Sequence, residues 1–400
     1  MPVPVTAPTQ ATLPELGNTR IAFAGKSDRH LWKAYWLFRI IGDPTLTRIG
    51  SALTRAALAL HLPIKWFIKA TIFQQFVGGE NVQEGMRTAA RLGKSHVGTI
   101  LDYSVEGKDD EGSLDHTKEE LLRCIAAAKG HPEIPFAVFK PTGISPTDLL
   151  ERVSSGALLD AHEQASWERA RNRMLDLGKA AHAAGVPLLV DAEDSWLQQA
   201  IDDVVEEMMQ RFNTERPIVF NTIQLYRHDR LAFLRESLLR AERGGYQVGM
   251  KLVRGAYMEK ERERAKEMGY PDPIQPDKAA CDRDYDDALR FCLDHIDRIA
   301  VMAGTHNEAS TLLAARLMEE RQLPRDHDRI WFAQLLGMSD HISFNMAAAG
   351  YNVAKYMPYG PVREVLPYLI RRAEENTSAR GQTGRELGLI REERKRRASA

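Results

Sequence analysis

The chain has 400 residues, with 54 basic and 55 acidic side chains and a formal net charge of -1. This balance excludes the basic footprint of a nucleic-acid-binding protein, and the length suits a large barrel or two domains with terminal additions. Three widely spaced cysteines without a CxxC pair indicate neither a disulfide framework nor a cysteine zinc site, so we expect a reducing, cytoplasmic environment. No apolar run is long enough to cross a membrane.

The N-terminal quarter divides into a leader and a helical arm. Residues 1–20 lack the basic and then apolar order of a signal peptide, and we predict a disordered leader. Residues 21–95 contain three successive amphipathic pieces, LWKAYWLFRIIG, LTRIGSALTRAALAL and PIKWFIKATIFQQF. We expect this arm to pack against the main domain, although its Trp, Phe and Lys content also suits a membrane surface.

From residue 96 to residue 380, short apolar runs alternate with longer amphipathic ones. Eight strands are predicted, over residues 97–105, 136–142, 187–194, 218–226, 248–257, 299–307, 330–338 and 352–360. Because a helical pattern follows each of them, we predict an α/β fold, a (β/α)8 TIM-type barrel. A doubly wound open sheet is the alternative, but no GxGxxG follows the first strand. Residues 381–400 are predicted to be a charged tail, with a short helical piece and then a solvated charge run.

Polar side chains occur near the C-terminal end of every predicted strand, where the loops of a barrel converge on one mouth. In chain order the residues at these ends are Asp102, Lys140, Asp191 with Glu193, Asn221 with Gln224, Arg254 with Tyr257, Thr305 with His306 and Asn307, Gln334 with Met338, and Tyr356 with Tyr359. We therefore expect a polar site at one mouth of the barrel.

Several of these residues allow a structural as well as a functional interpretation. Lys140 is either an ordinary loop lysine or an enclosed functional group. Asp191 and Glu193 alternate along one predicted strand, so both are expected to face the barrel interior, as a functional pair or as partners in structural ion pairs. His306 taken alone is typical of a satisfied polar residue, and without an HExxH or similar spacing we expect no metal site.

The helix after the eighth strand has two unlike faces. Val362, Leu366, Leu369, Ile370 and Ala373 fall on one side, while Tyr368, Arg371, Arg372 and Glu375 fall on the other. The polar face fits a solvated stripe of ion pairs, and two adjacent arginines also suit a carboxylate ligand. Because the helix follows the eighth strand directly, we expect it to cover the mouth of the barrel.

Four motifs resemble those of the proline dehydrogenase family. They are KLVRGAY at residues 251–257, VDAED at 190–194, THN at 305–307 and YLIRRAEEN at 368–376. The resemblance runs in the same order from QFVGGE to the end of the C-terminal helix. It implies a (β/α)8 barrel with FAD at its mouth that oxidises L-proline to Δ1-pyrroline-5-carboxylate.

The resemblance also implies roles for individual residues. Lys140, Arg371 and Arg372 are expected to hold the proline carboxylate, with Glu375 pairing the arginines, Asp191 bracing the site through ion pairs and Asp102 supporting it. The walls around the substrate ring are expected from Tyr257, Leu335, Tyr356 and Tyr368. The residues expected around the flavin are Gln224, Lys251, Val253, Arg254, Ala256, Thr305, His306 and Asn307. Lys251 replaces an arginine of the fused enzymes, and the bulky Tyr356 favours proline over its 4-hydroxy derivative.

The family resemblance further implies a quinone as electron acceptor. A peripheral contact of the arm with a membrane, at its inner face, is a hypothesis that follows from this acceptor. A Schiff-base aldolase on the same barrel is the competing interpretation, with Lys140 as nucleophile and Asp191 and Glu193 as acid and base.

Overall fold

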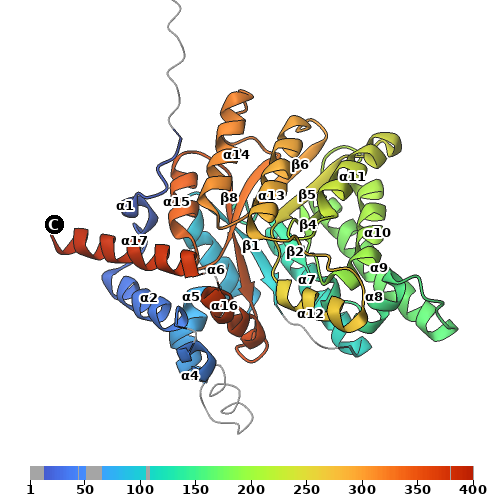
Figure 1. Ribbon diagram of the computed structural model, residues 1–400, viewed down its shortest axis with the longest axis horizontal. Helices are drawn as coiled ribbons and strands as arrows, with labels where there is room; N and C mark the ends of the chain where they lie inside the picture. The colour runs from blue at the N-terminus through green and yellow to red at the C-terminus, as the bar shows by residue number, and fades with distance from the viewer. Residues whose placement is uncertain (1–12, 44, 51–64, 105–108, 379, 400) are drawn as a thin grey trace, which may run out of the picture.

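The computed structural model describes residues 13–43, 45–50, 65–104, 109–378 and 380–399, and for residues 373–383 only the backbone. Within this part, eight parallel strands close into a barrel in chain order (Figure 1). The barrel closes where the last strand pairs with the first, from Val97 opposite Val353 to Tyr103 opposite Tyr359. The strands are β1 Val97–Tyr103, β2 Phe136–Phe139, β3 Leu188–Val190, β4 Val219–Gln224, β5 Val248–Val253, β6 Ile299–Gly304, β7 Ile330–Leu335 and β8 Val353–Tyr359. The (β/α)8 prediction is confirmed, and closure rules out the open sheet.

Helices surround the strands, and each strand is buried on both faces. Inside the barrel, residues such as Phe136, Val138 and Phe220 pack together, and a larger apolar layer lies between the strands and the helices. Continuous apolar strands are what a parallel sheet covered on both faces requires. The surrounding helices are α6 Val82–Gly93, α7 Glu111–Ala128, α8 Thr147–Ser154, α9 Ala161–Ala184, α10 Ser195–Phe212, α11 Arg230–Gly244, α12 Met258–Met268, α13 Lys278–Asp294, α14 Glu308–Glu320 and α15 Asp340–Ala348, with a short 3-10 turn η2 at Pro141–Gly143.

The helical arm packs on the C-terminal helices. It consists of α1 Thr19–Ala22, α2 Asp28–Ile41, a helical stretch at residues 45–50, α4 Lys65–Ile68, the π-helix η1 Lys69–Phe73 and α5 Gln74–Phe76, and the C-terminal helices are α16 Leu366–Ser378 and α17 Arg380–Ala398. Phe38 and Phe76 of the arm share one apolar cluster with Leu369 and Ile390 of these helices. Figure 1 shows α2 and α5 next to α16. Of the second predicted amphipathic piece, residues 51–60 lie outside the described residues.

The prediction of a disordered leader as far as residue 20 is wrong for residues 13–20. Leu16 is buried in the core, and the side-chain amide of Asn345 donates to its backbone oxygen at 3.1 Å. Asn18 caps α1 by accepting a hydrogen bond from the backbone N–H of Ile21. The apolar side chain of Leu16 thus holds this segment on the barrel, while residues 1–12 lie outside the described part of the chain.

The prediction of a solvated C-terminal charge run holds for most side chains of the run and fails at Glu393. The run belongs to α17, where the side chain of Glu393 is fully buried. It pairs with Arg396 at 2.8 Å and with Arg397 at 2.7 Å, and it accepts a hydrogen bond from Thr19 at 3.0 Å. Because Arg396 and Arg397 neutralise Glu393, the helix can bury this one carboxylate against the arm, while most other charged side chains of the run remain exposed.

Two further observations concern the cysteines and the helices. Cys124, Cys281 and Cys292 are free and buried. Among the described residues, none of the helices combines the length and apolar character needed to cross a membrane.

Candidate active site

Asp191 lies at the centre of the polar group in the barrel mouth. It follows directly after β3 and forms a short ion pair with Lys251 of β5. It also accepts a hydrogen bond from the Tyr356 hydroxyl of β8 at 2.6 Å, and its other cationic neighbour is Lys140, at 4.0 Å. Burial opposes ionisation here, but the charges of Lys251 and Lys140 hold the pKa of Asp191 below its ordinary value. Three strands therefore meet at one carboxylate.

Asp102 forms the second anionic anchor of the mouth. The Lys140 Nζ donates to both of its carboxylate oxygens, at 3.0 and 3.2 Å, and the hydroxyl of Ser104 donates to one of them. The ring of Tyr356 lies near both lysines, with its centroid 5.9 Å from the Nζ of Lys140 and 5.2 Å from that of Lys251. Burial, followed by the charges of Asp102 and Asp191, raises the pKa of Tyr356 well above its ordinary value. Its hydroxyl therefore stays protonated and donates.

The expectation that Glu193 faces the barrel interior beside Asp191 is wrong. Strand β3 ends at Val190, so strand alternation does not extend to Glu193. Its carboxylate instead accepts a hydrogen bond from the Thr142 hydroxyl at 2.7 Å. Glu193 therefore braces the turn that follows Lys140.

Arg254 connects several polar side chains on the side of the mouth formed by β5 and β6. Its guanidinium donates to Asp282 at 2.7 Å, to the Thr305 hydroxyl at 2.8 Å and to the Ser310 hydroxyl at 2.9 Å. Asn307 caps α14 by accepting a hydrogen bond from the backbone N–H of Ser310. A helix N-terminus beside an arginine favours an anionic group.

The KLVRGAY turn after β5 requires its glycine. Gly255 has a φ of 133°, and a Cβ there would lie 2.5 Å from ring atoms of Tyr226. Beyond this turn Ala256 is exposed, whereas Val253 and Tyr257 are partly buried. These residues therefore form the rim of the mouth rather than its floor.

Gln224, the last residue of β4, is buried with an incomplete set of hydrogen bonds. Its side-chain oxygen is inaccessible to solvent and has no hydrogen-bond partner among the described residues. A buried polar atom without a partner costs about 1–3 kcal/mol. A ligand that donates a hydrogen bond at this point would remove that cost.

Helix α16 borders the mouth, and its polar face is not the solvated stripe that its sequence alone allows. Tyr368 is buried, and the guanidinium carbon of Arg372 lies 5.2 Å from the centroid of its ring. Tyr368 is a further, smaller cause of the raised pKa of Tyr356, through an electrostatic interaction. Arg371 and Arg372 are partly buried, as is Leu335, which packs against the cluster containing Leu369. The side chain of Glu375 lies outside the described residues.

His306 connects the THN loop to the start of α15. Its Nδ1 lies 2.9 Å from the Ser339 hydroxyl oxygen. Burial lowers the pKa of His306 to about 3, assisted by the charges of Lys355, Arg372 and His341. The ring is therefore neutral near pH 7.

This depressed pKa predicts a loss of stability in acid. Between pH 6.5 and pH 3 the unfolded chain binds a proton at His306 that the folded protein does not bind. Stability should therefore fall on acidification, by at most about 1.4 kcal/mol per pH unit for one proton. Urea unfolding between pH 7 and pH 5 should show a smaller loss for His306→Asn than for the unaltered protein. Parallel curves for the two proteins would contradict the assignment.

The sequence interpretation missed residues that support the site from behind. Lys355 of β8 is fully buried, pairs with Asp340 at 2.9 Å and donates to the backbone oxygen of Met338 at 2.5 Å. Asp340 in turn pairs with Lys26 of the arm at 2.6 Å. A lysine inside an apolar strand was a usable signal for Lys355, whereas its partners follow from no local pattern.

Comparison with known proteins identifies the family. The proline dehydrogenase profile matches residues 85–385. This chain belongs to the proline dehydrogenase family. The activity that gives this family its name is the oxidation of proline.

The relatives differ in their named roles. The chain is 36% identical to the carbapenem antibiotics biosynthesis protein CarD of Pectobacterium carotovorum, over 80% of this chain and 83% of that protein. It is 32% identical to mitochondrial proline dehydrogenase 1 of Dictyostelium discoideum, over 85% of this chain and 67% of that protein. It is also 32% identical to the hydroxyproline dehydrogenase of Xenopus laevis, over 94% and 88% of the two chains.

A solved structure supports the fold. The proline utilization A protein of Bdellovibrio bacteriovorus, inactivated by N-propargylglycine, superimposes with a TM-score of 0.71 at 20% identity. The match covers 90% of this chain but only 38% of that one. At this identity the likeness concerns the fold alone.

Proposed function

We propose that this protein oxidises L-proline to Δ1-pyrroline-5-carboxylate, with FAD as its cofactor and a quinone as the final electron acceptor. The observation that carries the proposal is the barrel mouth itself, where Lys140 and helix α16 border a floor made by Asp191, Lys251 and Tyr356. This arrangement supplies fixed positive charge for a carboxylate and aromatic walls for a small ring. It forms within a chain of the proline dehydrogenase family.

In this proposal the cationic groups orient the substrate. Lys140, held by Asp102, and the forks of Arg371 and Arg372 bind the proline carboxylate, because guanidinium and ammonium groups form charge-assisted hydrogen bonds with carboxylates. Their positive charge also favours proline with a neutral nitrogen over the ammonium form. Glu375 pairs with the arginines and limits their movement.

The walls of the site fix the ring of the substrate. Tyr257, Leu335, Tyr356 and Tyr368 enclose the pyrrolidine ring and exclude water. Asp191 acts on the substrate only indirectly, by holding Tyr356 and Lys251 in place. A bound geometry fixed in this way lowers the entropic cost of reaching the transition state.

The residues on the other side of the mouth fit a flavin. The buried Gln224 oxygen lacks a hydrogen-bond donor, and the isoalloxazine ring carries one. Arg254, Thr305 and Asn307 at the start of α14 suit the phosphates, and Lys251, Val253, Ala256 and His306 complete the set. FAD, when bound, supplies the hydride acceptor for the ring carbon next to the proline nitrogen.

The visible spectrum of the purified protein tests this function. We expect flavin absorbance that bleaches when L-proline is added without oxygen, and slower bleaching with 4-hydroxyproline because Tyr356 fills the space near the ring. A colourless protein that proline leaves unchanged and that borohydride traps on a carbonyl substrate at Lys140 would instead favour the aldolase interpretation. The two hydrogen bonds from Lys140 to Asp102 favour the charged ammonium form, whereas an aldolase needs a neutral amine as nucleophile.

We further propose a division into a leader at residues 1–12, an arm at 13–95, a catalytic barrel with its covering helix at 96–378 and a docked helix at 380–399.

We also propose a peripheral contact of the arm with the inner face of a membrane. The exposed side chains of Trp32, Trp66 and Phe67 support the contact itself. Flotation with anionic liposomes should carry the protein upward, and the double variant Trp66→Ser, Phe67→Ser should float less. Equal flotation of both proteins would contradict the contact.

A further inference from the structure

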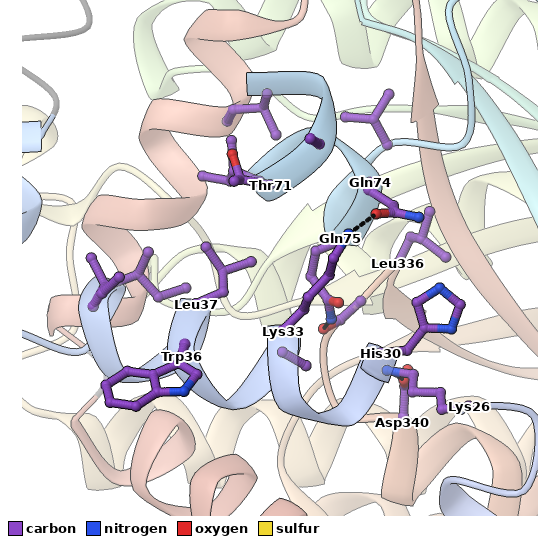
Figure 2. A pocket seen from close by; sticks show the side chains of 18 of the residues that line it. Lys26, His30, Lys33, Trp36, Leu37, Thr71, Gln74, Gln75, Leu336 and Asp340 are labelled. Atoms are coloured by element: carbon purple, nitrogen blue, oxygen red, sulfur yellow. Dashed lines mark hydrogen bonds and ion pairs between the residues drawn. The ribbon is translucent and has the colours of Figure 1, made fainter. Parts of the chain in front are cut away.

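A cavity lies between the arm and the back of the barrel mouth. Its volume is about 770 Å³, within the range of small-molecule sites. Leu37 of α2 and Thr71 of η1 line it on the arm side, and Leu336, Leu366 and Leu369 line it on the barrel side. Figure 2 shows the side chains of α2 and of η1 on opposite sides of this cavity, with Leu336 at one end and Trp36 at the other.

The lining selects against charged ligands. Most of the lining side chains are aliphatic or aromatic, and the cationic ones are two lysines with polar partners and the exposed Arg91. Lys26 pairs with Asp340 at 2.6 Å, and the Nζ of Lys33 donates to the side-chain oxygen of Gln74 at 3.3 Å. A nucleotide would need more positive charge or a row of backbone donors for its phosphates. The cavity instead suits a flat apolar ligand with few polar atoms.

Strand β7 and helix α16 both contribute to this cavity and to the barrel mouth. Leu336 lines the cavity, and its neighbour Leu335 ends β7 at the mouth. Helix α16 has a similar position, because Leu366 and Leu369 line the cavity while Tyr368 acts on Tyr356 in the mouth. A ligand in the cavity would therefore lie directly behind the proposed substrate site.

The arm side of the cavity has an unusual backbone. Residues Lys69–Phe73 form a π-helix, and the Thr71 hydroxyl donates to the backbone oxygen of Phe67 at 2.6 Å. Single-turn π segments occur frequently at functional sites. Thr71 and its neighbour Ile72 both face the cavity.

The outer rim of the cavity is apolar and exposed. Trp36, Ile40, Leu46 and Phe67 line the cavity and also have large exposed fractions, from 41% for Trp36 to 57% for Phe67. A single exposed apolar residue is ordinary, but a group of them around an opening marks a ligand or interaction site. This apolar rim suits the entry of an apolar ligand.

We propose that this cavity binds a lipophilic quinone that reoxidises the enzyme. The inference rests on the proposed function, because it names the site of the electron acceptor. Oxidation of proline releases two electrons and two protons, and a quinone takes up both pairs when its two carbonyls become hydroxyls. An ammonium group has three N–H donors, so Lys33 can hold Gln74 and a quinone carbonyl together.

The test compares variants that fill the cavity with one that does not. Leu37→Trp places an indole in the cavity, and Ala70→Trp does so from an exposed lining position that disturbs the fold less. Ile49→Trp is the matched control, because Ile49 is an exposed aliphatic residue of the arm outside the lining. Equilibrium dialysis with ubiquinone-1 measures binding, and steady-state assays measure the KM for the same quinone and for a water-soluble dye.

We expect both filling variants to weaken ubiquinone-1 binding and raise its KM by about tenfold or more, since small steric changes in apolar pockets have effects of this size. The KM for the dye and the bleaching by proline should stay unchanged, as should all values for Ile49→Trp. Unaltered quinone binding in both filling variants, or an equal loss in Ile49→Trp, would overturn the proposal. Failure of the proposed function gives a different result, because proline then leaves the unaltered protein unbleached while quinone binding persists.

Discussion

Replacing Asp191 with alanine should destabilise the protein by about 3–5 kcal/mol and abolish most proline oxidation. This is the usual cost of breaking a buried ion pair by removing one partner. The reason is specific to the mouth, where Lys251 is almost fully buried and forms its ion pair with Asp191. Without that carboxylate, an uncompensated ammonium remains, and the Tyr356 hydroxyl loses its acceptor. Chemical unfolding and kcat/KM for proline measure the two effects.

Two further variants separate charge from packing. Asp191→Asn keeps the size of the side chain but removes its charge. Its activity should therefore fall about as far as that of Asp191→Ala, while its packing should be less disturbed. Asp176→Ala breaks an ion pair with Lys118 in which the aspartate is about half exposed, and it should cost less than about 1 kcal/mol. If Asp191→Ala costs no more than Asp176→Ala, Asp191 does not anchor the site.

Replacing Arg371 with alanine should reduce kcat/KM for proline by roughly 30-fold or more, equivalent to about 2 kcal/mol of transition-state stabilisation. The residue lies on the polar face of α16, partly buried beside the mouth. We expect it to hold the substrate carboxylate through two parallel hydrogen bonds. Steady-state kinetics with proline measures the loss.

The controls for Arg371 test geometry as well as charge. Arg371→Lys keeps the charge but removes the planar fork, so it should recover only part of the activity. Arg363→Ala removes an exposed arginine from the turn before α16 and should have little effect. Equal kcat/KM in Arg371→Ala and the unaltered protein would refute the assignment of this helix to the carboxylate.

The barrel was predictable because its signals are local and repeated. Eight apolar runs of strand length, each followed by a helical pattern, leave few architectures open, and all eight lie where strands form. The gathering of Lys140, Asp191 and Tyr356 at one mouth follows from the same pattern, because parallel strands end on the same face.

The partners of these residues were less predictable. Strand alternation placed Glu193 beside Asp191, but the position where β3 ends depends on packing and not on the local pattern. The mixed charges near residue 393 predict a solvated segment. Only the tertiary structure shows that Glu393 is buried and neutralised by Arg396 and Arg397. The pairing of Asp340 with Lys26 and Lys355 joins three distant segments, which no sequence window contains.

The docking of the arm on α16 and α17 has a consequence for how the chain folds. The arm shares its apolar cluster with these two helices, and the hydrogen bond from Thr19 to Glu393 spans 374 positions. During synthesis the arm emerges before the barrel, but the helices that cover it emerge after the barrel. The barrel strands can begin to pair before Phe38 and Phe76 have the side chains of α16 and α17 to pack against. Contacts so distant in sequence form slowly, so we expect the arm to reach its final position late and to expose its apolar side chains until then.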